Sequence, residues 1–108
     1  MKKLLTLFAL VTTLSVSSQI QVVQFNANWN SANSVNWLDK LTDCKTSNVD
    51  IATDKAAQSK YKIIVVPTIV VFHHGEEVKR YQANIMMQIE AKLEDVQTLV
   101  DETVMESF

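Results

Sequence analysis

Residues 68–72 form an almost uninterrupted apolar run directly after Pro67, the only proline of the chain. Such a run is typical of a strand buried on both faces, because a strand with one wet face alternates apolar with polar residues. Burying both faces of a strand requires helices on each side of its sheet. The run therefore predicts an α/β domain with residues 68–72 as a central strand.

Further strands and helices are predicted on both sides of this run. Apolar residues mixed with amides predict a strand at 20–27, Val49 and Ile51 a short strand, and residues 77–82 an edge strand after a turn at Gly75. Apolar residues that recur every three or four positions predict helices at 31–43 and 84–105. Thr53 or Asp54 can cap a further short helix, predicted at 54–60. The order β-α-β-α-β-β-α indicates a mixed four-stranded sheet flanked by three helices.

Residues 1–18 have the three-part pattern of a secretory signal peptide. Lys2 and Lys3 precede an apolar run, and small residues lead to a predicted cleavage point between Ser18 and Gln19. The alternative is a short membrane anchor, but the run is shorter than the roughly 18 to 20 residues of a spanning helix. We therefore expect a signal peptide at 1–18, a domain at 19–108, and a periplasmic or secreted protein without membrane contact after cleavage.

Charge and metal-ligating residues narrow the function further. Ten basic and twelve acidic residues give a net charge of −2, and removal of Lys2 and Lys3 makes it −4, which disfavours nucleic acid as a partner. Cys44 is the only cysteine, so it forms no disulfide within the chain. His73 and His74 are adjacent on a strand end and point to opposite faces. We expect no metal and no other cofactor.

Three segments resemble motifs of the thioredoxin family. Residues 22–29 (VVQFNANW) are similar to the strand and tryptophan before its redox site, residues 60–68 to its proline segment, and residues 70–76 (VVFHHGE) to the following strand and glycine turn. The resemblance spans the chain after the leader and implies a minimal thioredoxin-like fold, without the strand and helix that open the full version.

The resemblance also implies that the redox site has been lost. The family places Cys-X-X-Cys after the tryptophan, and the corresponding residues here are Trp29, Asn30, Ser31, Ala32 and Asn33. A carboxamide provides neither a thiolate nor a two-electron couple, so Asn30 and Asn33 cannot carry thiol-disulfide exchange. Gln24 stands where the family commonly has a buried aspartate. We predict that the protein is not an enzyme.

A binding face is expected around Pro67. In the family the corresponding proline is cis, and the backbone before it pairs with an extended peptide. The resemblance implies such a face at Val65, Val66, Pro67 and Thr68, with the main-chain groups of Val65 and Val66 unpaired beside Trp29. The alternative is that the proline persists only as architecture.

Several other residues allow two interpretations. Asparagines 26, 28, 30, 33 and 36 indicate helix capping and a solvated loop, or a polar surface that holds an anion. Cys44 is either a half-buried small residue or an exposed thiol. Met86 and Met87 suit an adaptable binding patch, with at least one of them expected in the core.

The leading functional prediction is an exported, redox-inactive module that binds a protein or an extended peptide, or acts as a scaffold. One alternative is an accessory protein that forms mixed disulfides through Cys44. The other is a purely structural domain that dimerises through its last helix. The sequence leaves the partner and the oligomeric state open.

Overall fold

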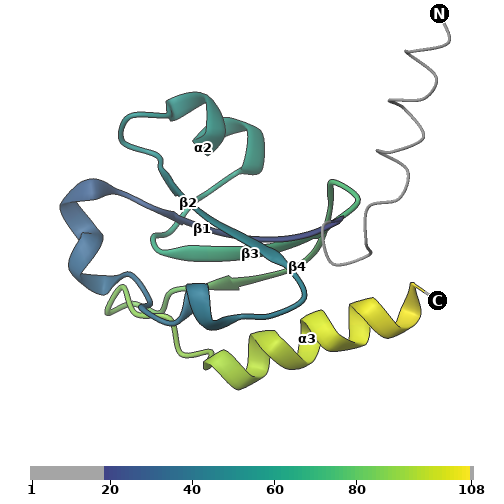
Figure 1. The fold of residues 1–108 in the computed structure, drawn as a ribbon. Helices are drawn as coiled ribbons and strands as arrows, with labels where there is room; N and C mark the ends of the chain where they lie inside the picture. Colours follow the sequence, from purple (N-terminus) through teal and green to yellow (C-terminus); the bar gives the residue numbers. More distant parts are fainter. Residues whose placement is uncertain (1–18, 108) are drawn as a thin grey trace, which may run out of the picture.

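The computed structural model describes residues 19–107. The strands of this part of the chain form one sheet (Figure 1). The strands are β1 (Ile20–Asn26), β2 (Lys45–Asp50), β3 (Thr68–His73) and β4 (Glu76–Gln82), in the order β2-β1-β3-β4. β1 is parallel to β2 and antiparallel to β3, and β4 is antiparallel to β3. The predicted mixed sheet is confirmed. The predicted signal peptide lies outside the described residues.

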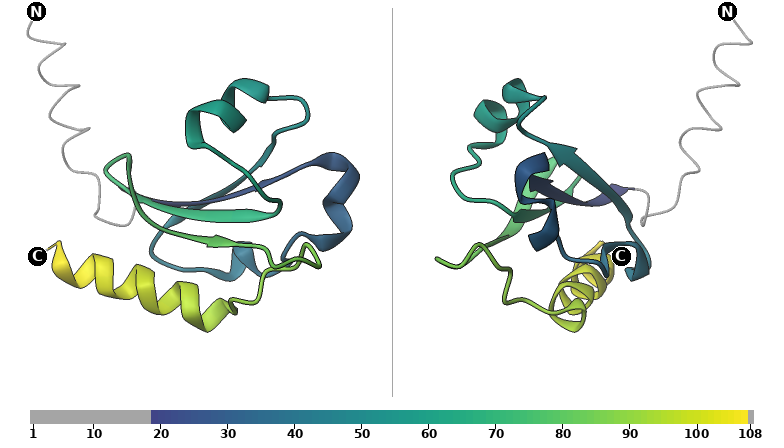
Figure 2. Two further views of the ribbon diagram at one scale, coloured as in Figure 1. Left: turned by 180° about the vertical axis from the view of Figure 1, so that it is seen from behind. Right: turned by 90° about the vertical axis from the view of Figure 1, so that its left-hand side faces the viewer.

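Two helices lie on opposite faces of the sheet, α2 (Lys55–Tyr61) on one and α3 (Leu93–Glu106) on the other (Figures 1 and 2). Alternate residues of β1 and β3 pack into two separate apolar clusters. Val23, Phe25, Val70 and Phe72 face α2, whereas Val22, Ile69 and Val71 pack with Val96 and Val100 of α3. The central strand predicted at 68–72 is thus buried on both faces. No helix among residues 19–107 is long and apolar enough to cross a bilayer.

The helix predicted at 54–60 is confirmed as α2, and both of its ends are held by side chains. The Asp54 carboxylate accepts a hydrogen bond from the Ala57 N–H at 3.0 Å, which caps the start. The helix ends at Lys62, whose φ of 53° is left-handed. Arg80 of β4 then donates to the carbonyls of Tyr61 (2.9 Å) and Lys62 (3.2 Å).

The helix predicted at 31–43 is wrong. The chain forms two short 3₁₀ helices instead, η2 (Asn28–Asn33) and η3 (Leu38–Lys40), and the backbone is already extended at Ser34, directly after η2. Asparagine and serine compete for backbone hydrogen bonds and are weak helix formers, so the apolar spacing alone does not produce an α-helix. Leu38 and Leu41 are nevertheless buried in the cluster that faces α3.

The helix predicted at 84–105 begins too early, because α3 starts at Leu93. The Asn84 side-chain oxygen accepts hydrogen bonds from the N–H groups of Met86 (2.8 Å) and Gln88 (3.1 Å), and so holds a turn there. Neither methionine of this turn is in the core, since Met86 is 69% exposed and Met87 41%. The expectation that one of them is buried is therefore wrong.

The second strand was predicted only around Val49 and Ile51, but β2 begins at Lys45 and ends before Ile51. Its first four residues, Lys45 to Asn48, are polar. A polar strand at the edge of a sheet buries little surface and shows no apolar alternation.

Arg80→Ala is expected to lower the free energy of unfolding by about 1 to 2 kcal/mol, because two carbonyls at the end of α2 lose a charged donor. Arg80 also pairs with the Glu77 carboxylate at 2.8 Å, on the protein surface. Glu77→Gln removes only that ion pair and should cost less than about 1 kcal/mol. Urea denaturation of both variants measures the difference. Equal losses would show that the carbonyl contacts contribute nothing.

Candidate functional site

Residues 29–33, which the resemblance aligns with the redox site of the family, follow β1 closely and lie within η2. Asn30 is buried (5% exposed), whereas Trp29 beside it is 69% exposed. Asn33 donates through Nδ2 to Asn30 Oδ1 at 2.8 Å, so the two former redox positions are joined by a hydrogen bond between carboxamides. Since Cys44 is the only cysteine, the chain has no Cys-X-X-Cys site.

Asn26, the last residue of β1, is the centre of a hydrogen-bonded amide network. Its Nδ2 donates to the Asn30 carbonyl (3.0 Å) and to Ser34 Oγ (2.7 Å). Its Oδ1 accepts from the N–H of Ala27 (2.9 Å) and from Asn30 Nδ2 (3.1 Å). Capping and a solvated loop are therefore the wrong interpretation for Asn26 and Asn30, which are buried and satisfy each other.

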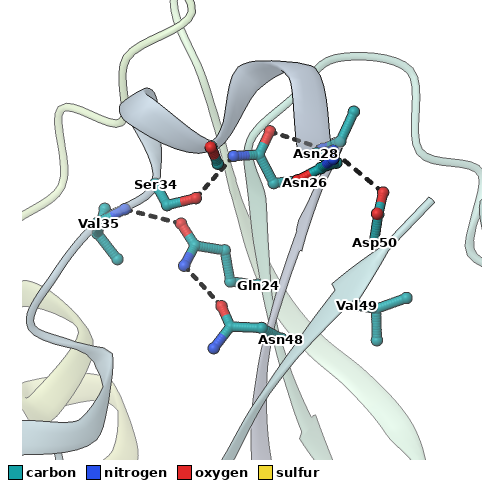
Figure 3. Close-up of a pocket in the computed structure, with 10 residues that line it drawn as sticks. Gln24, Asn26, Asn28, Ser34, Val35, Asn48, Val49 and Asp50 are labelled. Carbon is teal, nitrogen blue, oxygen red and sulfur yellow. Dashed lines mark hydrogen bonds between the residues drawn. The ribbon is translucent and has the colours of Figure 1, made fainter. Parts of the chain in front are cut away.

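Gln24 is also buried and bonded at both ends of its carboxamide (Figure 3). Nε2 donates to Asn48 Oδ1 of β2, and Oε1 accepts from the Val35 N–H, both at 2.9 Å. The side chain thereby connects β1 to the neighbouring strand and to the segment after η2. A hollow of about 400 Å³ lies beside it, lined mainly by amides, hydroxyls and Asp50.

The Pro67 loop contacts the amide network directly. The Val66–Pro67 peptide bond is cis. The main-chain groups before it are only partly unpaired, which corrects the expectation from the sequence: the Val65 carbonyl accepts from Thr68 Oγ1 (2.7 Å) and the Val66 carbonyl from Asn30 Nδ2 (3.4 Å). Within residues 19–107, the N–H groups of Val65 and Val66 have no acceptor.

An apolar groove of about 330 Å³ is lined in part by Val65 and Val66. Trp29 forms part of one wall, and the loop between β4 and α3, which lies at the same end of the sheet as η2 in Figures 1 and 2, forms another. Ile64 is 82% exposed and Ile85 99%. Apolar side chains gathered around a groove at such exposure are typical of an interaction site. The main apolar residues of the groove are Trp29, Ile51, Ile64, Val66, Ile85 and Met87.

Sequence reasoning assigned no role to Ile64 and placed Ile85 in a helix. It therefore missed both residues as part of the groove. The signal for Ile85 was the preceding Asn84, a residue that favours turns. Asn84 also donates from its backbone N–H to the Gln88 carbonyl, and its own carbonyl accepts from Met87 N–H, both at 2.9 Å. This wall of the groove is therefore a closed, hydrogen-bonded turn.

Cys44 is partly buried, away from η2, between the end of η3 and β2. Burial raises the pKa of its thiol to about 11, and the carboxylates of Asp43 and Asp101 add to the effect. Of the two interpretations of Cys44, the half-buried small residue therefore fits the structure, and the exposed thiol does not. At neutral pH the sulfur is a protonated thiol and a weak nucleophile.

The histidines lie at the opposite end of the central strands. His73 faces Ile20 across the β1–β3 pair, whereas η2 follows the other end of β1. A serine acts as a nucleophile only with a general base within reach. Ser31 and Ser34 have no histidine beside them to act as that base. In the part of the chain that the structure describes, no three histidine, cysteine or acidic side chains are grouped to hold a metal.

The sheet order, the two covering helices and the proline loop beside Trp29 define a thioredoxin-like α/β fold. Solved thioredoxins are similar over most of the chain. A mutant thioredoxin from Halobacterium salinarum NRC-1 is 22% identical, with a TM-score of 0.60, and the match covers 81% of this chain and 76% of that one. For thioredoxin-2 of the malaria parasite the values are 18%, 0.62, 78% and 82%, and for Schistosoma mansoni thioredoxin 20%, 0.59, 90% and 86%.

At these identities the likeness establishes the fold. No family model matches the sequence. No curated protein matches it either.

Asn26→Ala is expected to lower the free energy of unfolding by about 2 kcal/mol, because buried partners in the amide network lose their hydrogen bonds. Asn28→Ala is the matched control: its side chain is exposed and has no hydrogen-bond partner among residues 19–107. The control should change stability by less than about 0.5 kcal/mol. Urea denaturation measures both, and an Asn26→Ala protein as stable as the control would contradict the role of the network.

Proposed function

We propose that this protein is an exported, redox-inactive thioredoxin-like module that binds an extended peptide segment of another protein. The binding face consists of Trp29 and the segment Val65, Val66, Pro67 and Thr68. Export rests on the signal-peptide pattern of residues 1–18 and implies a periplasmic or extracellular partner.

The observation that carries the proposal is that the N–H groups of Val65 and Val66 have no acceptor among residues 19–107, and that both residues line the 330 Å³ groove. An extended peptide supplies carbonyl acceptors to such N–H groups and places alternate side chains against the surface. The exposed walls at Trp29 and Ile85 favour an apolar side chain in the groove. Main-chain recognition and an apolar groove together suit a peptide better than a small polar ligand.

Redox inactivity is supported by the chemistry of the residues at the former redox site. Asn30 and Asn33 hydrogen-bond to each other and hold no sulfur. The remaining thiol, Cys44, has its pKa raised from 9.0 to about 11, which reduces its thiolate fraction near neutral pH by roughly a hundredfold. This argues against the accessory role through mixed disulfides. The other alternative, a domain that dimerises through its last helix, is compatible with peptide binding. The two roles would use different surfaces, the last helix and the face around Trp29 and Pro67.

The purified protein is expected to show no disulfide reductase activity above buffer in an insulin reduction assay. Cys44 should react with a thiol reagent roughly a hundredfold more slowly than the same residue in the unfolded chain, because its thiolate is scarce. Its rate should rise about tenfold per pH unit through neutral pH. Insulin reduction that persists in Cys44→Ser would show that another group carries redox chemistry.

Trp29→Ala is expected to weaken peptide binding by about 30-fold, the loss typical of a central aromatic contact. The probe is the tightest-binding peptide selected from a displayed random library on the wild-type protein, measured by calorimetry. Met105→Ala is the matched control, because Met105 is similarly exposed (73%) but lies on α3 away from the groove. Unchanged affinity in a folded Trp29→Ala protein would place the peptide on another surface.

A further inference from the structure

The polar hollow beside Gln24 has one charged group in its wall, the carboxylate of Asp50 (Figure 3). Its Oδ1 accepts from the N–H groups of Asn28 (3.1 Å) and Ala52 (2.9 Å), whereas Oδ2 accepts no hydrogen bond from residues 19–107. The one ion pair within that range lies on β4, so no basic side chain of the described chain pairs with Asp50. The hollow therefore presents an uncompensated negative charge.

This free carboxylate oxygen is accessible to a ligand. In the part of the chain that the structure describes, no buried side-chain oxygen or nitrogen lacks a hydrogen-bond partner, so the unpartnered Oδ2 of Asp50 is in contact with solvent. The Ser31 hydroxyl and the Asn28 carboxamide line the same hollow and also have no partner among residues 19–107. Gln24 and Asn48, by contrast, bond to each other. Neutral acceptor oxygens are thus available in the same hollow as the carboxylate.

A guanidinium group matches this wall best. It carries five N–H donors in one plane and no acceptor, so it can bond to a carboxylate oxygen and to neutral oxygens at the same time. Asp50 repels an anion, and the ammonium group of lysine is more strongly hydrated and is costlier to move into a half-buried site. The hollow, at about 400 Å³, lies within the range of about 300 to 1,000 Å³ for small-ligand pockets. It therefore has room for an arginine side chain.

The hollow and the peptide groove share a rim. Asn28 and Asp50 line the hollow, and the residues that directly follow them, Trp29 and Ile51, line the groove. Consecutive Cα atoms are about 3.8 Å apart. The hydrogen bond from the Asn28 N–H to Asp50 Oδ1 joins the two segments of the rim. A peptide with an apolar side chain in the groove therefore has the hollow within reach of a residue close by in its sequence.

We propose that the partner segment carries an arginine close in sequence to its apolar residue, and that the guanidinium binds Asp50 in the polar hollow. The inference rests on the proposed function for the position of the peptide, and it adds a charged determinant of specificity. The guanidinium donates to Asp50 Oδ2 and to the Ser31 hydroxyl, while Oδ1 keeps its two backbone hydrogen bonds. The carboxylate also orients the peptide, because it fixes on which side of the apolar residue the arginine lies.

An amino-acid derivative tests the hollow without any peptide. Nα-acetylarginine amide at about 10 mM should shift the amide NMR signals of Asn28 and Ala52, whose N–H groups are bonded to the Asp50 carboxylate. The citrulline derivative has a similar shape without the charge and should shift them roughly five times less. Equal shifts from the two derivatives overturn the inference. This comparison uses the wild-type protein, so it does not depend on the folding of a variant.

Asp50→Asn is expected to remove the response to the arginine derivative. The variant keeps Oδ1 as an acceptor for both backbone N–H groups and replaces the free oxygen by an amide nitrogen, so it should remain folded by circular dichroism. Glu76→Gln is the matched control: it removes the same charge from an exposed residue at the start of β4, opposite His73 at the other end of the sheet. A response that is retained in folded Asp50→Asn, or lost in Glu76→Gln, overturns the assignment to Asp50.

The peptide selected on the wild-type protein tests the specificity. It should contain an arginine, and replacing that arginine by citrulline should weaken binding about tenfold, because a charge-assisted hydrogen bond is lost. Asp50→Asn should cause a similar loss, and the two changes together should weaken binding no more than either one alone. Glu76→Gln should leave the affinity unchanged. Losses that multiply when the two changes are combined would show that the arginine and Asp50 do not interact.

The outcomes separate this inference from the proposed function. Peptide binding that requires Trp29 but is indifferent to arginine and to Asp50→Asn overturns the inference and leaves the proposed function intact. A hollow that prefers the arginine derivative to the citrulline one, in a protein that selects no peptide, supports the arginine site and overturns the peptide-binding function.

Discussion

The antiparallel pairing of β1 with β3 positions the remaining parts of the structure. Both strands are buried on both faces, so each supplies residues to the apolar cluster under α2 and to the one against α3. Phe25 lies opposite Thr68, which brings the end of β1 and the start of β3 to the same end of the sheet. η2 follows the one and the Pro67 loop precedes the other. The contact between Asn30 and the Val66 carbonyl is a consequence of this register.

The amide network stabilises that end of the sheet by satisfying its own buried groups. A buried carboxamide without partners costs about 1 to 3 kcal/mol, and the cost falls away only when donors and acceptors match in number and direction. Asn26, Asn30 and Asn33 achieve this within residues 26–33. Because Asn30 points inward to the network, the adjacent Trp29 is turned toward solvent. One local structure therefore accommodates both the asparagines at positions 30 and 33 and the exposed Trp29 beside them.

The sequence predicted the parts of the fold in which burial and pattern agree. β3 was predicted because a continuous apolar run favours a strand buried on both faces. α2 was predicted because Asp54 favours the start of a helix. The helix at 84–105 was placed too early because Ile85 and Ile89 fit a helical period, and only the side chain of Asn84 decides for a turn. Only the end of β2 was predicted, because its polar first four residues leave no periodic signal.

The site was predictable to a smaller extent, since it depends on contacts between distant segments. The motif around Pro67 located the loop that we propose as the binding face, but pairing of the Val66 carbonyl with Asn30 joins residues 36 apart in sequence. No local pattern encodes that contact. The groove wall at Ile85 likewise depends on where the loop after β4 lies relative to Trp29, which the tertiary fold determines.

The distribution of satisfied and unsatisfied groups indicates what kind of ligand each surface suits. The amide side chains at the centre of the network are already bonded to one another, so they have little capacity left for a ligand. By contrast, the main-chain N–H groups of Val65 and Val66 have no acceptor among residues 19–107. Main-chain groups bond to any extended backbone, and specificity then comes from the side chains around them. Apolar walls provide it at the groove.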